Sequence, residues 1–402
     1  MNQTMGWKKN AWVLWICNFI VMGSMNMIIP FLPLFLGELG VHNHKELSMW
    51  TGMIMSSTFL SAAIMAPIWG SFADKYGQRT NLIRAGIGMG VINILMSFAN
   101  TPLMLLILRF VYGFFSGFVS VSFSYLSKTT PREHIGKALG FLQTGGVSGG
   151  IIGPLIGGAL ADWFGYHAVF AVTGMLIFST ILLVKVFLKP DAPSRTEREE
   201  HGSFRDVLGN KNLQILFFAT FIVQMALLST NSMMSIFVKY IVGDAANLTF
   251  LAGLVTSITG FANIIGSPLL GRLGDRIGQS RILPTAMFLT GCLYLPQLWT
   301  HTIYELYIWR FLQGLVLGGM IPAIQTLIKK RSTDQVYGRA FGVNSSCQFL
   351  GNLAGPLLGG FISGHFSVSY VFGFAGVLLM AGSILLKWKI ALRPVHAGGA
   401  SR

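Results

Sequence analysis

Arg109 and Arg310 are charged residues that fall inside apolar stretches of the sequence. An arginine at the centre of a membrane helix costs about 2.5–3.5 kcal/mol even on a lenient insertion scale, and charged groups kept there mark ion, proton or substrate pathways. Both arginines are therefore candidate functional residues. The alternative is an arginine near the end of a span, whose long side chain extends to the membrane interface.

Two short segments each place an aspartate between glycines. They comprise Gly70, Asp74, Gly77 and Arg79 in the first copy and Gly271, Asp275 and Gly278 in the second. The glycines permit a tight turn, and the aspartate places a carboxylate at the membrane surface. Such a carboxylate accepts hydrogen bonds from a helix N-terminus or pairs with a basic side chain. The alternative for both segments is an ordinary solvated turn between two spans.

A glycine-rich pattern, GFLQTGGVSGGIIGPLIGG at 140–158, returns as GVNSSCQFLGNLAGPLLGG at 342–360. Glycines spaced by four residues line one face of a helix, which a second helix can then approach closely. The proline in each copy removes a backbone hydrogen bond and bends the helix. The members of the two faces are Gly149, Gly153, Pro154 and Gly157, and Gly351, Gly355, Pro356 and Gly359. Chance does not explain spacing that repeats in this way.

Membrane helices are the elements that must position these residues. The 402 residues are 52% hydrophobic and 11% charged, whereas soluble domains carry about 25% charged residues. About twelve apolar stretches of roughly 20 residues follow one another. They lie near 12–36, 48–69, 81–99, 102–124, 137–161 and 167–188, and near 212–240, 248–271, 281–300, 302–328, 338–362 and 367–391. Because no small-residue cleavage site follows the first stretch, we interpret it as a retained span.

The basic residues are distributed unevenly between the two sides of the membrane. The chain has 29 Lys and Arg against 14 Asp and Glu, a net charge of +15, and most of the basic residues fall on the side of the N-terminus. This asymmetry predicts that both termini are cytoplasmic, and it leaves no basic patch of the kind that binds nucleic acid. Cys17, Cys292 and Cys347 are far apart, so we expect no disulfide and no metal site. We also find no cofactor-binding motif.

The two halves of the sequence repeat each other at an offset of about 200 residues. Asp74 recurs as Asp275 and Arg109 recurs as Arg310. Six spans in each half give corresponding elements the same orientation, which predicts parallel repeats related by an axis along the membrane normal. We therefore expect an all-α membrane protein with two six-helix bundles, residues 1–188 and 212–402, joined by a polar linker at 189–211. We expect the tail after Pro394 to be disordered.

The segment GSFADKYGQR at 70–79 resembles the signature between helices 2 and 3 of the major facilitator superfamily, and residues 271–278 resemble its weaker second copy. Residues 140–158 resemble the helix 5 signature of that superfamily's antiporters. Gly23, Pro30 and Pro33 resemble a helix 1 pattern of its twelve-span drug:proton antiporters. The resemblance covers essentially the whole chain, which looks most like bacterial multidrug exporters.

The resemblance implies a gate and a proton-coupling residue. It implies that Asp74 holds the halves together on the cytoplasmic side in the outward-facing state. From the repeat we expect Asp74 to pair near Arg339, and Asp275 to pair near Lys137. Arg109 corresponds to the basic residue of the family's helix 4 motif, which is implicated in proton coupling, and Arg310 is its counterpart in the second half.

A proton antiporter needs a titratable group that alternates between the two sides, usually a carboxylate within the membrane. None of the 14 acidic residues and no histidine is clearly in the middle of a span. Proton binding then falls to Glu305 or Asp162, if they lie deeper than the expected boundaries, or to Asp74 at the gate.

The resemblance also implies that spans 1, 4, 7 and 10 face a central cavity. These spans offer Met22, Met25, Asn26, Tyr112, Phe115, Phe118, Gln224, Met225, Asn231, Gln313 and Gln325. The chain's 19 Met and 31 Phe provide adaptable apolar walls, which suit bulky amphipathic molecules of varied shape. The alternative for each residue is an ordinary core or lipid-facing position.

These observations and the resemblance predict a monomeric secondary transporter of a bacterial cell membrane, with small amphipathic compounds, protons and the bilayer as its partners. It would export those compounds in exchange for protons by alternating access, with the two glycine faces in close contact between the halves. Alternatives within transport are export of a specific metabolite, such as a sugar or lipid precursor, and proton-coupled import. The six-span duplication argues against a membrane receptor, and the lack of paired titratable groups in the spans argues against an enzyme.

Overall fold

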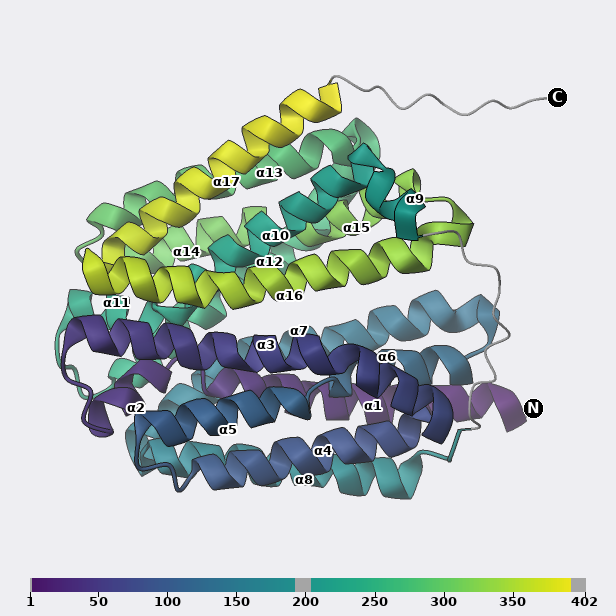
Figure 1. The fold of residues 1–402 in the computed structure, drawn as a ribbon, viewed down its shortest axis with the longest axis horizontal. Helices are drawn as coiled ribbons and strands as arrows, with labels where there is room; N and C mark the ends of the chain where they lie inside the picture. The colour runs from purple at the N-terminus through teal and green to yellow at the C-terminus, as the bar shows by residue number, and fades with distance from the viewer. Residues whose placement is uncertain (1, 192–203, 392–402) are drawn as a thin grey trace.

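The computed structural model describes residues 2–191 and 204–391 of the chain (Figure 1). Residues 192–203 of the expected linker and residues 392–402 of the expected tail lie outside the described residues. The described part is α-helical with short connections, and it contains no strand. The all-α fold class expected from the sequence is confirmed.

The first half of the chain forms the elements α1 to α8. They are α1 (Asn2–Met27), α2 (Leu32–Glu38), α3 (His44–Tyr76), α4 (Gln78–Met96), α5 (Pro102–Phe114), α6 (Phe118–Thr129), the 3-10 turn η1 (Arg132–His134), α7 (Ile135–Phe164) and α8 (Tyr166–Phe187). The second half forms α9 to α17. They are α9 (Phe204–Gly209), α10 (Lys211–Ser232), α11 (Met234–Val242), α12 (Leu248–Ile277), α13 (Gln279–Tyr294), the 3-10 turn η2 (Leu295–Trp299), α14 (Ile303–Leu317), α15 (Met320–Arg331), α16 (Asp334–His365) and α17 (Val368–Ala391).

Nine helices of the described chain are long and apolar enough to cross a membrane, if helices that continue through a short break count as one. The pair of α1 and α2 makes a tenth, with a bend of 48° between them. Two further helices, α4 and α16, occupy the places of the third and eleventh expected spans. They carry more polar residues, among them Arg84 in α4 and Asn344 and Asn352 in α16.

Several expected spans are broken into two helices. In the fourth span α5 ends at Phe114 and α6 begins at Phe118. Gly117 lies in this break with φ of +110°, a left-handed conformation that a residue with a Cβ adopts only with strain. Similar breaks separate α10 from α11 and α14 from α15.

Polar side chains fix the start of several helices at the membrane boundary. The side chain of Asn43 accepts a hydrogen bond from the amide of Lys45 at the start of α3, at 2.9 Å. Thr101 and Thr302 accept corresponding bonds at the starts of α5 and α14. Such caps satisfy amide groups that have no partner within the helix.

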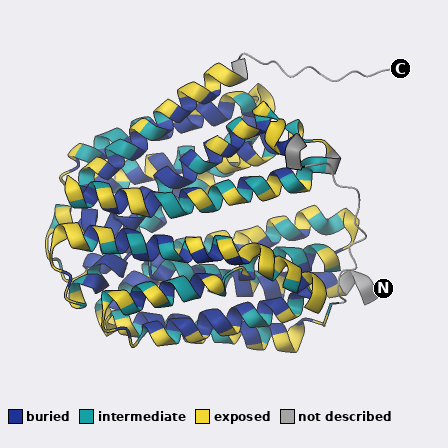
Figure 2. Cartoon of the chain, viewed as in Figure 1, coloured by how far each residue is buried: buried dark blue, intermediate teal, exposed yellow. Residues whose placement is uncertain are grey.

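Each half has its own hydrophobic core. One cluster of buried apolar residues draws on residues between Trp7 and Leu188, and the other on residues between Val207 and Leu386. Figure 2 shows buried residues on the inward side of the helices and exposed residues on the outside. Many exposed side chains are large and apolar, including Phe98, Leu182, Phe261 and Val377, as a surface in contact with lipid requires.

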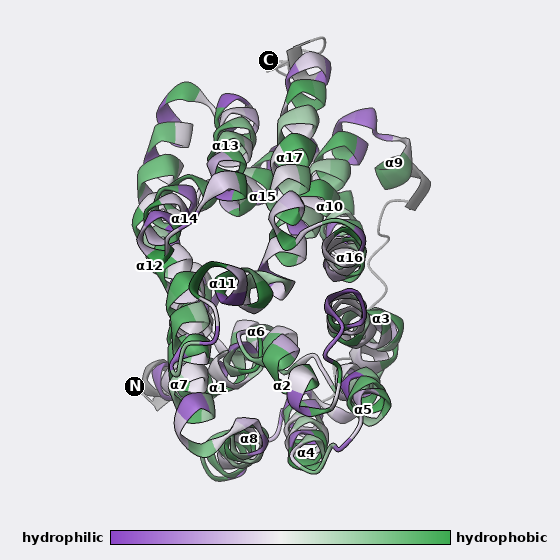
Figure 3. Cartoon of the chain, turned by 90° about the vertical axis from the view of Figure 1, so that its left-hand side faces the viewer, coloured by the Kyte–Doolittle hydropathy of each residue, from purple (hydrophilic) through white to green (hydrophobic). Residues whose placement is uncertain are grey.

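The two halves lie next to each other with their helices roughly along one direction (Figure 1). We call the end at which α1 and α10 begin and α17 ends the terminal end, and the opposite end the far end. Viewed from the far end, α1 to α8 form one group and α10 to α17 the other (Figure 3). The halves meet mainly where α3 packs against α16 and α7 against α12.

Hydrogen bonds join the halves from the far end to about the middle of the bundle. Between α3 and α16, the hydroxyl groups of Ser48 and Ser363 lie 2.8 Å apart, and Ser56 donates to the carbonyl oxygen of Leu353 at 2.6 Å. Between α7 and α12, Ser257 donates to a carbonyl oxygen of α7 at 2.5 Å. Toward the terminal end, α3 and α16 diverge (Figure 1). We call this set of interactions, with those of Asp162 described below, the far-end contact.

Candidate functional site

A cavity of about 590 Å³ lies between the two halves on the terminal side of the far-end contact. Its walls come from α1, α3, α4, the break between α5 and α6, and α6 in the first half, and from α16 in the second. The larger apolar side chains in its lining are Met22, Met25, Phe59, Trp69, Met89, Phe118 and Phe349. The longer polar side chains are Asp74, Gln78, Asn81, Arg84, Gln348 and Asn352. We call this space the central cavity.

One wall of the central cavity is a stacked arginine and tryptophan. The guanidinium carbon of Arg84 lies 3.6 Å from the centre of the Trp69 ring. The same guanidinium donates to the Asn81 side-chain oxygen at 2.6 and 2.9 Å, and the indole N–H of Trp69 donates to the carbonyl oxygen of Phe114 at 2.6 Å. The sequence alone did not single out Arg84 as a site residue. One signal was available in the sequence. Gly77 marks the turn before α4, and Arg84 lies more than one helical turn beyond it, inside the expected span.

Asp74 lies near the end of α3 and also lines the central cavity. Among the described residues, no ion pair joins Asp74 to Arg339. Formation of the expected pair needs a conformation in which the halves meet at the terminal end. It therefore stays a prediction for that conformation.

The turn between α3 and α4 is held within the first half. Gly77 has φ of +87°, and the carboxylate of Asp191 accepts hydrogen bonds from the amides of Gln78 and Arg79 at 2.7 and 2.9 Å. Arg79 also donates to the carbonyl oxygen of Lys185 at 2.8 Å. Asp191 is thus the cap that satisfies the start of α4. Asp191 belongs to the polar segment that was expected to be a linker, and no pattern in the sequence marks it as a cap.

The second copy of this turn is simpler. Gly278 has φ of +95°, and the side-chain amide of Gln279 donates to Asp275 at 3.4 Å. No ion pair joins Asp275 to Lys137 among the described residues. As with Asp74, the expected pairing with the other half is a prediction for a conformation closed at the terminal end.

Arg109 and Arg310 are buried inside their own halves, with 7% and 1% of their surface exposed. The guanidinium carbon of Arg109 lies 6.0 Å from the Phe170 ring centre, and that of Arg310 lies 5.2 Å from the Phe372 ring centre. In each arginine the Nε atom has no hydrogen-bond partner among the described residues. The side chains therefore do not extend to the interface, and neither lines the central cavity.

Two far-end carboxylates differ in their surroundings. Asp162, at the end of α7, accepts hydrogen bonds from the amides of Thr249 and Phe250 at 3.3 and 2.9 Å, so a carboxylate of one half caps α12 of the other. Glu305 is exposed at the start of α14 and accepts from the amide of His301 at 3.1 Å. Glu305 was expected to carry a proton only if it lay deeper than the predicted end of its span. It does not lie deeper in this structure.

The two glycine faces pack within each half, so the expectation that they join the halves is wrong. A Cβ built at Gly153 would lie 2.5 Å from the carbonyl oxygen of Gly23 on α1, and one at Gly355 would lie 2.7 Å from that of Met225 on α10. The other members of these faces, Gly149, Gly157, Gly351 and Gly359, face the same partner helices. The glycine-proline helices do join the halves, but through adjacent residues.

The adjacent residues face across the molecule because consecutive side chains on a helix point about 100° apart. A Cβ built at Gly158 would lie 2.6 Å from the carbonyl oxygen of Thr249 on α12. Gly360 corresponds to it in the second half and faces Ser48 on α3. The carbonyl groups of Pro154 and Pro356 contact Gly253 and Gly52 in the same interfaces. In each Gly-Gly pair, 157–158 and 359–360, the first glycine therefore packs against a helix of its own half and the second against a helix of the other half.

Three of the residues expected around the cavity line it, namely Met22, Met25 and Phe118. The others, Asn26, Tyr112, Phe115, Gln224, Met225, Asn231, Gln313 and Gln325, do not line it in this conformation. Gln224 and Met225 are buried where α10 packs against α16, and Gln313 accepts a hydrogen bond from Gln297 at 3.0 Å. Gln224 and Gln313 therefore make their contacts within their own half and do not face the central cavity.

Residues 14–251 and 216–401 match the sequence profile of the Major Facilitator Superfamily. The chain belongs to the Major Facilitator Superfamily. This is a family of transporters. The chain is 37% identical over 398 residues to a multidrug resistance protein, MdtG, of Yersinia enterocolitica, and the match covers 98% of this chain and 96% of the relative. It is 38% identical over 377 residues to the MdtG protein of Salmonella typhimurium, covering 93% of each chain.

Solved structures of superfamily transporters share the fold at low sequence identity. A D-xylose-proton symporter superposes with a TM-score of 0.77 at 14% identity, covering 94% of this chain and 96% of the symporter. A bacterial homologue of the human lysosomal transporter Spinster, in an inward-facing and occupied conformation, superposes with a TM-score of 0.76 at 13% identity, covering 95% and 94%. These likenesses show the superfamily fold of two helix bundles.

Proposed function

We propose that this protein exports amphipathic drugs and other toxic compounds from a bacterial cell in exchange for protons, by alternating access. The observation that carries the proposal is the central cavity, which both halves line and which the far-end contact closes on one side. The name of the full-length relatives, multidrug resistance protein, supports the choice of substrate class.

The distribution of basic residues supports an orientation for this conformation. Lys8, Lys9, Lys211, Lys387 and Lys389 lie at the terminal end, in keeping with the excess of lysine and arginine on cytoplasmic segments. In this orientation both termini are cytoplasmic, and the central cavity is accessible from the cytoplasm. This is the state in which an exporter takes up its substrate.

The lining of the central cavity suits substrates with large apolar surfaces and varied shapes. Flexible thioethers of Met22 and Met25 adapt to different ligands, and Trp69 and Phe118 supply flat apolar surfaces. The polar part of the lining, with Arg84 stacked on Trp69, favours a second candidate. That candidate is export of a specific metabolite that carries hydrogen-bonding or anionic groups.

We propose that Asp74 couples transport to protons at the terminal end. Its carboxylate lines the central cavity, so water in the cavity reaches it in the present conformation. In the outward-facing state the ionised group would interact with the start of α16, and a proton that enters through the cavity, then open at the far end, would reach Asp74 and remove that interaction. Loss of the interaction would favour return to the present state. The buried Arg109 would act on this equilibrium through the packing of the first half.

Efflux of ethidium from cells that express the protein, with and without a proton uncoupler, tests the proposal. We expect efflux that the uncoupler abolishes. Ala66→Trp places a large ring in the central cavity and should stop efflux. Ile64→Trp, on the same helix but 53% exposed on the outside, is the matched control and should keep it.

The coupling step is tested in the same cells. Asp74→Asn should lower proton-driven efflux, and an unchanged rate in this variant would refute the role of Asp74. A competition panel of unrelated amphipathic cations, neutral drugs, sugars and lipid precursors separates the two candidates. Inhibition of ethidium efflux by several unrelated drugs supports multidrug export, whereas inhibition by one metabolite class alone supports the specific exporter.

A further inference from the structure

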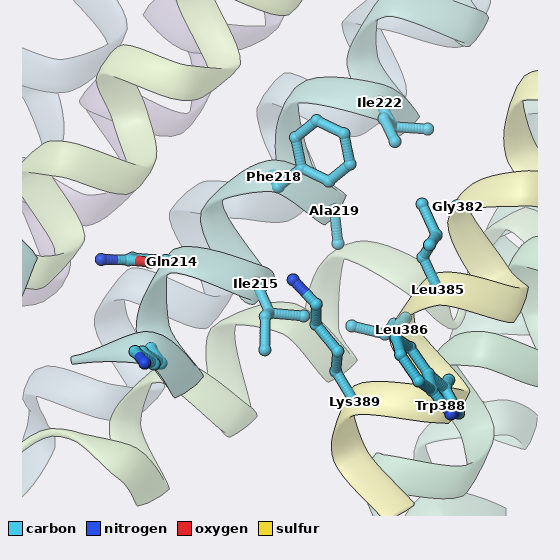
Figure 4. Close-up of a pocket in the computed structure, with 11 residues that line it drawn as sticks. Gln214, Ile215, Phe218, Ala219, Ile222, Gly382, Leu385, Leu386, Trp388 and Lys389 are labelled. Carbon is cyan, nitrogen blue, oxygen red and sulfur yellow. The ribbon is translucent and has the colours of Figure 1, made fainter. Parts of the chain in front are cut away.

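A second cavity, of about 610 Å³, lies on the outside of the second half at the terminal end (Figure 4). It is a groove between the start of α10 and the end of α17. The wall on α10 is one helical face, on which Ile215, Phe218, Ala219 and Ile222 recur at helical spacing. We call it the α10–α17 groove.

The α10–α17 groove is open toward the bilayer. Phe218, Leu385 and Trp388 are 51%, 46% and 63% exposed, and among the described residues its lining comes from the second half alone. It is therefore separate from the central cavity, and it does not depend on the proposed transport function. A tryptophan at this level is typical of the interface between acyl chains and headgroups.

Two lysines, Lys211 and Lys389, line the groove, and no acidic residue is among its lining residues. Figure 4 shows the side chain of Lys389 extending from α17 across the groove toward α10, near Ile215. Two cations that share one groove repel each other unless an anion lies between them. Among the described residues, the lining of the groove supplies apolar walls and positive charge, but no anion.

The first half shows that this arrangement is not a consequence of the internal repeat. Matching contacts set the register between the halves at 202 residues: Gly149 faces the Phe19 carbonyl group as Gly351 faces that of Phe221. In this register Lys9 corresponds to Lys211, and Phe187 corresponds to Lys389. The ammonium of Lys9 lies 5.0 Å from the Phe187 ring centre, a cation–π contact that partners the lysine within the half. In the second half a lysine replaces the ring.

We propose that the α10–α17 groove binds an anionic phospholipid of the leaflet at the terminal end. The phosphate would lie between Lys211 and Lys389, and the acyl chains would lie against the apolar residues of α10 and α17. Basic pockets between membrane helices on the cytoplasmic side favour such headgroups. Residues 392–402, which follow α17 in the sequence, contain two arginines and no Asp or Glu side chain.

Quenching of Trp388 fluorescence by brominated lipids tests the site on the purified full-length protein in nanodiscs. The chain has nine tryptophans, so the signal of Trp388 is the difference between the wild type and Trp388→Phe. We expect brominated phosphatidylglycerol to quench at a lower lipid fraction than brominated phosphatidylcholine. Each of Lys211→Gln and Lys389→Gln should weaken this preference by about fivefold.

Lys387→Gln is the matched control, because Lys387 is exposed on the same turn of α17 but does not line the groove. It should keep the preference for phosphatidylglycerol. Equal quenching by the two lipids, or a preference that survives the double variant Lys211→Gln with Lys389→Gln, would overturn the proposal. So would a preference that inorganic phosphate removes at constant ionic strength, or one that appears only after deletion of residues 392–402.

Discussion

The carboxylate of Asp162 joins the two halves at the far end without an ion pair. It accepts hydrogen bonds from two amides at the start of α12, where the helix dipole favours a negative charge. This interaction exists only while the far end is closed. The charge on Asp162 therefore stabilises the present conformation relative to one that is open at the far end.

Asp162→Asn should shift the protein toward conformations open at the far end. The variant loses the charge and one of two acceptor atoms, which costs about 1 kcal/mol and changes the ratio of the two states about fivefold. Spin labels at Glu46 and Phe366, on the far-end sides of α3 and α16, should report a larger population at long distance. Asp244→Asn is the matched control, because Asp244 pairs with Lys239 in its own half. An equal shift in the control would contradict the role of Asp162.

At the level of the helices, α7 carries two glycine surfaces with different partners. Gly153 packs against α1 in its own half, and Gly158 packs against α12 across the molecule. Close helix approach through small residues is the usual way in which membrane helices associate. The two surfaces therefore contribute to different equilibria, one to the stability of a bundle and one to closure of the far end.

Leucine substitutions on α7 should separate these two contributions. Gly153→Leu forces α1 and α7 apart and should destabilise the first half by about 1–3 kcal/mol, which lowers the melting temperature of the purified protein. Gly158→Leu should keep the melting temperature closer to that of the wild type and instead open the far end in the spin-label measurement. Gly140→Leu, where nothing lies within 4 Å of a built Cβ, is the control. Equal melting temperatures for Gly153→Leu and Gly140→Leu would contradict this division.

For the whole molecule, the contacts between the halves are concentrated at one end, and the cavity lies on the other side of them. The fold makes this asymmetry possible because each half buries its own core. The halves can then rotate against each other without loss of either core. Which side of the membrane the central cavity opens to in this conformation depends on which end faces the cytoplasm.

The orientation can be measured by labelling single added cysteines with a membrane-impermeant maleimide. His42→Cys, at the far end, should react in intact cells, and Glu133→Cys, at the terminal end, should react only after permeabilisation, because basic segments stay cytoplasmic. Both positions are exposed. The wild type, whose Cys17 is buried and whose Cys292 and Cys347 are partly buried, gives the background. The reverse pattern would place the central cavity on the outside.

The sequence by itself determined the number and order of most spans, the repeat between the halves and the existence of two glycine faces. Apolar length, charge asymmetry and helical spacing are local properties, so the chain displays them before it folds. The sequence also placed Arg109 and Arg310 inside spans, and both are buried in the structure.

The tertiary structure alone decided which surfaces meet. A period of 3.6 residues defines a face but not its partner, and so the glycine faces were assigned to the wrong interface. Arg84 became a cavity residue only when α4 was placed against α3, and Asp162 and Asp191 became helix caps only when distant helix ends came together. These contacts depend on the packing of whole helices, which the spacing of residues along one helix does not encode.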